Sequence, residues 1–118
     1  MSELTKIEYQ ILMKFYEIYK PATKHELLAN YRDLNENTTA SFITSLLTKR
    51  YLEIAEIGIF QTSLARAYKP RLALLSFLQA EYGYNSVERL MQRAVRSINK
   101  ADQLDRLLVY IKEKKAQF

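Results

Sequence analysis

The apolar pattern of this sequence changes once, between Tyr51 and Pro70, and this change limits the folds open to the chain. Before and after this stretch, apolar residues recur at the three- and four-residue spacing of amphipathic helices. Within it, Leu52 and Ile54 alternate with polar residues, Gly58 and the Gln-Thr-Ser stretch 61–63 break the run, and a second alternating run ends at Pro70. Alternation, turn and alternation predict a two-stranded hairpin inserted in an otherwise helical chain.

Two helices are expected near the N-terminus, because capping-box pairs mark their starts. Thr5 is followed three residues later by Glu8, and Thr23 is followed in the same way by Glu26. In this pattern each side chain bonds the backbone N–H of the other residue, which satisfies donors at the start of a helix. The first pair predicts a helix that ends near Pro21, and the second predicts a shorter helix.

A third helix is expected after the polar segment 34–37, and its two faces differ. Its apolar stripe consists of Phe42, Ile43, Leu46 and Leu47. Short hydrogen-bonding side chains occupy the opposite face, although Glu, Lys, Gln and Arg are more usual on a solvated helix face. Because these side chains are short, they can form hydrogen bonds with base edges without steric hindrance. The alternative interpretation is that they form an ordinary solvent-facing surface. The predicted base-reading residues are Asn37, Thr38, Ser41, Thr44, Ser45 and Thr48.

Helix, helix, helix and hairpin within about 70 residues is the element order of a winged helix-turn-helix, in which the third helix enters the major groove of DNA. Cations in these elements are candidates for contacts with the phosphate backbone. Lys49 and Arg50 would also suit a helix C-terminus, so Arg66 is the clearest of these candidates. The predicted phosphate-binding residues are Thr23, Lys24, Lys49, Arg50, Arg66 and Lys69.

After Pro70 the sequence predicts helices separated by a turn at Gly83, with Asn85 or Ser86 as a cap and fraying from Lys112 onward. The apolar residues of this half exceed what three short helices can bury by themselves, which predicts a homodimer. We therefore expect a DNA-binding domain over residues 1–70 and a dimerisation region over residues 71–118. The predicted interface residues are Leu72, Leu74, Leu75, Phe77, Leu78, Leu90, Met91, Leu107, Leu108 and Ile111.

Composition narrows the function classes. The 118 residues include no cysteine, which excludes disulfides, thiolate metal sites and a cysteine nucleophile. Charged residues interrupt every apolar stretch before the roughly 20 residues of a membrane helix, and the N-terminus lacks the apolar core of a signal peptide, so a cytoplasmic protein is expected. The net charge of +5 agrees with a nucleic-acid partner, although it is concentrated in residues 71–118, where a solvated helix face is the simpler explanation.

The ordered set of motifs resembles the penicillinase-repressor (BlaI/MecI/CopY-type) family of winged-helix regulators. The matching motifs are Leu4-Thr5 with Glu8, Thr23 with Glu26-Leu27, Thr38-Thr39, Leu46-Leu47, the run from Lys49 to Leu52, and Arg66-x-Tyr68-x-Pro70. The resemblance implies a repressor that binds a palindromic operator on double-stranded DNA as a homodimer.

The chain also departs from the pattern of that family. Tyr16 stands where the family usually has Trp, and Arg50 stands where it often has Gly. The absence of cysteine excludes the copper response of some members. Leu90-Met91 replaces the Asn-Phe pair at which other members are cleaved, so relief by that cleavage is not expected.

Neither an enzyme nor a cofactor is expected. His25 is the only histidine, the carboxylates are scattered, and no glycine-rich phosphate loop is present. A single histidine without cysteine cannot build a typical transition-metal site or a catalytic triad, which predicts no metal dependence. The alternative to a DNA-binding regulator is a winged-helix protein-interaction module that binds a heterologous partner through its C-terminal helices.

Overall fold

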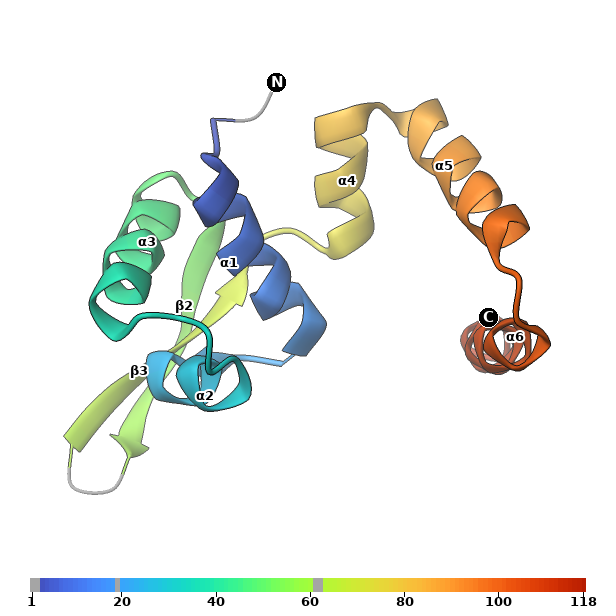
Figure 1. Cartoon of the computed structure of the whole chain (residues 1–118). Helices are drawn as coiled ribbons and strands as arrows, with labels where there is room; N and C mark the ends of the chain where they lie inside the picture. Colours follow the sequence, from blue (N-terminus) through green and yellow to red (C-terminus); the bar gives the residue numbers. More distant parts are fainter. Residues whose placement is uncertain (1–2, 19, 61–62) are drawn as a thin grey trace. The chain divides into compact units, whose positions relative to one another are not determined.

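The computed structural model describes the backbone of residues 3–18, 20–60 and 63–118, and the side chains of these residues except 56–65. The elements are α1 (Lys6–Ile18), β1 (Ala22–Thr23), α2 (Lys24–Asn30), α3 (Glu36–Thr48), β2 (Leu52–Phe60), β3 (Ser63–Pro70), α4 (Leu74–Tyr82), α5 (Tyr84–Ser97) and α6 (Ala101–Lys115) (Figure 1). The protein is mainly helical with a small antiparallel sheet, which confirms the coarse fold class predicted from the sequence. None of the described helices is long and apolar enough to cross a membrane.

The first two helices begin at the two predicted capping boxes. The backbone N–H of Thr5 donates to Glu8 Oε1 at 2.8 Å, and the N–H of Glu8 donates to Thr5 Oγ1 at 3.2 Å. Thr23 and Glu26 make the same reciprocal pair, with both distances at 3.0 Å. At α3, the side chain of Asn35 accepts a bond from the N–H of Thr38 at 3.1 Å. Each start is therefore fixed by local side-chain chemistry.

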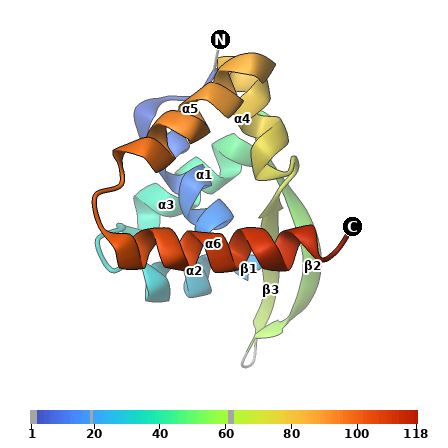
Figure 2. The same ribbon diagram turned by 90° about the vertical axis from the view of Figure 1, so that its right-hand side faces the viewer.

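The sheet contains the predicted hairpin and one further strand, in the order β1-β3-β2. Strands β2 and β3 lie side by side in Figures 1 and 2, with their pairing running from Leu52 opposite Pro70 to Phe60 opposite Ser63. β2 continues through Gly58, so a break at that residue is wrong, whereas Gln61 and Thr62 of the predicted breaking stretch lie outside the described residues. The short strand β1 adds to the free edge of β3, with Ala22 opposite Tyr68 and Thr23 opposite Ala67.

The chain divides into two compact units, Met1–Phe77 and Leu78–Phe118, and α4 contains the boundary. The core of the first unit brings together apolar residues from α1, α2, α3 and the sheet. Full burial of one large apolar side chain stabilises the fold by about 1.5–3 kcal/mol, so this core dominates the stability of the unit. The buried apolar residues are Ile11, Leu12, Phe15, Ala22, Leu27, Ile43, Leu46, Leu52, Ala67 and Phe77.

Phe77 joins this core through aromatic contacts. Its ring lies 5.9 Å from that of Tyr9, 5.7 Å from that of Tyr16 and 6.1 Å from that of Tyr51, measured between ring centroids. Tyr16 also donates its hydroxyl hydrogen to the carbonyl of Leu72 at 2.8 Å. Burial raises the pKa of Tyr16 to about 12, against a smaller opposing effect of the positive charge on Arg71. The segment that follows β3 is thus anchored to α1.

In the second unit, Gly83 ends α4 with a φ of 93°, a conformation that glycine adopts without a steric penalty. Helix α5 begins at the next residue, and no side chain caps it. The predicted cap at Asn85 or Ser86 is therefore wrong, because both residues lie in the first helical turn. Helix α6 continues past Lys112 to Lys115.

Candidate nucleic-acid interface

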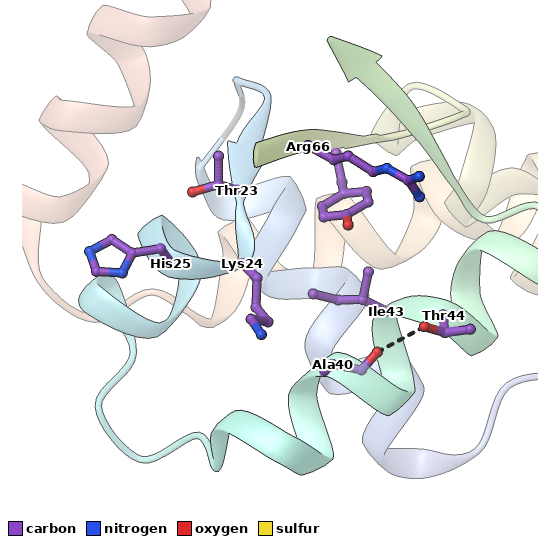
Figure 3. Close-up of a pocket in the computed structure, with 8 residues that line it drawn as sticks. Thr23, Lys24, His25, Ala40, Ile43, Thr44 and Arg66 are labelled. Atoms are coloured by element: carbon purple, nitrogen blue, oxygen red, sulfur yellow. Dashed lines mark hydrogen bonds between the residues drawn. The ribbon is translucent and has the colours of Figure 1, made fainter. Parts of the chain in front are cut away.

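A cleft of about 320 Å³ lies in the first unit where the start of α2, the middle of α3 and the strand β3 meet (Figure 3). We call it the α2–α3 cleft. It brings together predicted phosphate-binding and base-reading residues with four residues not predicted for the site, His25, Ala40, Ile43 and Tyr68. The lining residues are Thr23, Lys24, His25, Ala40, Ile43, Thr44, Arg66 and Tyr68.

Two local features place these elements together. The pairing of β1 with β3 puts Thr23 opposite Ala67, so the start of α2 lies next to Arg66 in the neighbouring position. On α3, Ile43 is buried while Thr44 is exposed, so the helix turns one face to the core and the next residue to the cleft. His25 lies at the α2 side of the cleft, away from Thr44 (Figure 3).

The predicted base-reading residues of α3 separate into two groups. Asn37, Thr38, Ser41, Thr44 and Thr48 are exposed. The hydroxyl of Thr44 donates to the carbonyl of Ala40 at 3.1 Å, and that of Thr48 donates to the carbonyl of Thr44 at 3.0 Å. A hydroxyl that donates in this way retains acceptor capacity, so both side chains can still accept a bond from an external donor.

Ser45 forms the second group, because it is half-buried and its hydroxyl donates to the carboxylate of Glu8 on α1. Lys49 approaches the same carboxylate, with its Nζ 2.8 Å from Glu8 Oε1 and 2.9 Å from the carbonyl of Glu3. Two residues predicted to contact DNA are therefore engaged inside the first unit. From the sequence, Glu8 is predicted only as part of a helix cap. Its contacts with Ser45 and Lys49 could not be predicted, because these partners lie 37 and 41 residues away.

Glu8 is a buried charged residue of this unit, with 2% of its surface exposed. Burial by itself raises the pKa of a carboxyl group. Here the hydrogen bonds from Lys49, Ser45 and Thr5 outweigh burial and lower the pKa from 4.5 to about 2. Glu8 therefore stays ionised at neutral pH and holds the C-terminal end of α3 against α1.

The remaining predicted phosphate-binding residues lie at the surface with different partners. Lys24 Nζ lies 3.7 Å from Glu36 Oε1, and Lys69 Nζ lies 3.6 Å from Glu53 Oε1. Both ion pairs are exposed to solvent, so each contributes little to stability. Arg66 is exposed and lines the α2–α3 cleft. Arg50 follows α3 with a φ of 67°, the left-handed conformation that favours glycine, and its carbonyl accepts a bond from Arg71 Nε at 2.7 Å.

The residues predicted for a dimer interface also differ in exposure. Phe77 is 1% exposed and belongs to the core of the first unit. Leu72, Leu78 and Leu107 are half-buried. The other six have more than two fifths of their surface exposed: Leu74, Leu75, Leu90, Met91, Leu108 and Ile111.

Among the described residues, no group of three or more His, Cys, Asp or Glu side chains is arranged to hold a metal ion. In comparisons with known proteins, no family model and no curated protein sequence matches the chain.

Proposed function

We propose that this chain is a sequence-specific DNA-binding transcription regulator, in which the first unit is a winged helix-turn-helix and α3 is the recognition helix. The observation that carries the proposal is the convergence of Lys24, Thr44 and Arg66 on one cleft. These residues come from three elements, yet they present two cations and a hydrogen-bonding helix face on the same side. A DNA duplex offers the matching chemistry, with phosphates flanking a groove of base edges.

The division of roles in this proposal follows from position. The exposed row Asn37, Ser41, Thr44 and Thr48 recurs at helical spacing and reads base edges from the major groove. Arg66 on β3 and Lys24 at the start of α2 contact phosphates beside α3, on the side of the α2–α3 cleft. Lys49 and Ser45 do not contact DNA in this arrangement, because they bind Glu8 and fix the orientation of α3.

We further propose that the regulator is a homodimer held by α5 and α6, which would match a palindromic operator. Within these two helices only Val87 is buried. The apolar residues Leu90, Met91 and Val95 lie along one face of α5, while Arg89, Arg93 and Arg96 lie on the opposite face. Leu104, Leu108 and Ile111 form a similar stripe on α6. A second copy offers the same two stripes and can cover both.

The test is a selection of bound sequences from a random duplex pool with the full chain, followed by titration of the selected duplex at several salt concentrations. We expect one palindromic sequence to be enriched and its affinity to fall steeply with salt. A pool that stays random after repeated rounds would refute the proposal of sequence-specific binding.

The exposed apolar stripes also suit a different partner chain, so a protein-interaction module is the second candidate. Sedimentation of the purified chain separates the two candidates. A monomer at micromolar concentration that enriches no duplex would favour the interaction module, whereas a dimer that enriches a palindrome would favour the regulator.

A further inference from the structure

A second cleft, of about 430 Å³, lies in the first unit where β3 ends and the chain turns towards α4. We call it the linker cleft, because Arg71, Leu72 and Ala73 between β3 and α4 contribute to it. Its volume falls within the range of about 300–1,000 Å³ that is typical of small-molecule sites. The two clefts share no lining residue, and of the predicted phosphate-binding residues only Lys69 lines the linker cleft.

The walls of the linker cleft are apolar and rich in rings. Phe15 and Tyr16 contribute from α1, Pro21 contributes from the segment before β1, and Pro70 contributes from the end of β3. Leu72 and Leu74 add aliphatic surface. Such a lining favours a flat, apolar ligand body, since aromatic rings pack well against other rings and against proline.

The charge of the linker cleft is positive. Lys20, Lys69 and Arg71 line it together with a single acidic residue, Glu53. Lys69 lies 3.6 Å from Glu53, so these two charges largely offset each other. Lys20 and Arg71 leave the cleft with a net positive charge, and both side chains are exposed.

The linker cleft is also held in shape by bonds that do not need a ligand. The hydroxyl of Tyr16 donates to the carbonyl of Leu72, which fixes the linker against α1. Arg71 Nε donates to the carbonyl of Arg50 at 2.7 Å, which orients the guanidinium group and leaves its two terminal nitrogens to bind an oxyanion. A preformed shape lowers the entropic cost of binding.

We propose that the linker cleft binds a small aromatic carboxylate, with its ring against Tyr16 and the two prolines and its carboxylate between Lys20 and Arg71. A planar carboxylate matches the fork of N–H donors on a guanidinium group, and the ring accounts for the apolar walls. This site goes beyond the proposed DNA binding and does not depend on it.

The test measures binding of 2-naphthoate to the full chain by calorimetry, beside two reference probes. The first is 2-naphthamide, which keeps the ring but carries no charge, and the second is inorganic phosphate, which carries charge without a ring. We expect naphthoate to bind at least about tenfold more tightly than either, because each lacks half of the recognition.

Substitutions of the two proposed carboxylate-binding residues test whether naphthoate binds in the linker cleft. Lys20→Gln and Arg71→Gln should each weaken naphthoate binding about tenfold, the effect of one missing charge-assisted hydrogen bond. Lys112→Gln removes the same charge from exposed α6 and should leave binding unchanged. The Lys20 side chain is exposed, so Lys20→Gln should fold normally, which circular dichroism checks.

Three results would overturn the proposal. The first is no binding of naphthoate at millimolar concentration. The second is equal binding of naphthamide or phosphate, since neither reproduces the combined recognition. The third is a loss of affinity in Lys112→Gln as large as in Lys20→Gln and Arg71→Gln, which would indicate unspecific attraction to a basic protein.

Discussion

The two units of this chain bury their apolar residues to very different extents. Of the apolar side chains that are buried in the described part of the chain, all but Val87 belong to the first unit. The first unit also contains a buried ion pair, two capping boxes and an aromatic cluster. In the second unit, α5 and α6 expose apolar stripes. The first unit therefore contains its own stabilising contacts, whereas α5 and α6 bury a single apolar side chain, that of Val87.

The largest expected difference between the units is the response to truncation of one apolar side chain. Phe15 is fully buried and its ring meets that of Tyr68 edge-on at 6.4 Å. Phe15→Ala should lower the free energy of unfolding by roughly 3–5 kcal/mol, because it leaves a cavity. Val109→Ala on α6, where the side chain is half exposed, should change it by less than about 1 kcal/mol in denaturant titrations. Equal losses would show that the units do not differ.

Acid should act on the first unit through Glu8. Its pKa is lower in the folded protein than the usual 4.5, so the ionised carboxylate stabilises the fold above pH 4.5, and this contribution is lost as the pH falls towards 2. This difference in pKa corresponds to a contribution of about 3 kcal/mol to the free energy of unfolding when the carboxyl group is ionised. Glu8→Gln should remove most of this pH dependence, whereas Glu88→Gln on exposed α5 should preserve it. Thermal unfolding between pH 2 and pH 6 measures the effect, and an unchanged profile in Glu8→Gln would contradict it.

A charge on the apolar stripe of α5 should affect association and leave the first unit intact. Met91→Glu should raise the dimer dissociation constant roughly 30-fold or more, the effect of about 2 kcal/mol at an interface centre. Gln92→Glu adds the same charge at the neighbouring position, outside the stripe, and should have little effect. Sedimentation at several concentrations distinguishes the two. Equal behaviour of the variants would place the contact elsewhere.

Within the first unit, Thr44→Ala should weaken binding to the selected duplex by roughly 1–3 kcal/mol and leave binding to random duplex nearly unchanged. The reason is that Thr44 lies on the exposed face of α3 and offers a methyl group and a hydroxyl acceptor. Ser76→Ala, which removes an exposed hydroxyl from α4, is the control and should leave both affinities unchanged. Fluorescence anisotropy gives both affinities, and a parallel loss on both duplexes would argue against base reading.

The smallest expected effect is that of Arg66→Ala. Without the Arg66 guanidinium, each subunit holds one phosphate fewer, so binding to both duplexes should weaken alike. The slope of log affinity against log salt concentration should become shallower by about one for each phosphate released. Lys112→Ala removes a charge from the second unit and should leave the slope unchanged. An unchanged slope in Arg66→Ala would show that Arg66 on β3 does not contact a phosphate.

The sequence predicts the elements whose signals are local. Both capping boxes are found as expected, because each involves residues three positions apart. The stripe of α3 is found as expected for Ile43 and Leu46, which are buried. The hairpin is also present, whereas β1 is not predictable, because a two-residue strand forms by backbone pairing and leaves no side-chain pattern.

Bonds between distant residues are beyond the reach of such patterns. Ser45 and Lys49 share a helix with the base-reading candidates, and periodicity alone cannot reveal that Glu8 binds both. The apolar run around Phe77 predicts an interface position, while its three tyrosine neighbours come from α1 and from the segment before β2. The expected DNA contacts and dimer interface stay predictions.

Arg50 combines a strained backbone conformation with a positive charge at the end of α3. Its backbone has a left-handed conformation, which costs residues other than glycine roughly 1–2 kcal/mol. A glycine would relieve that strain but would remove a cation beside the end of α3. Backbone stability and positive charge therefore favour different residues at this position, so a change to glycine should stabilise the fold while it lowers the charge beside α3.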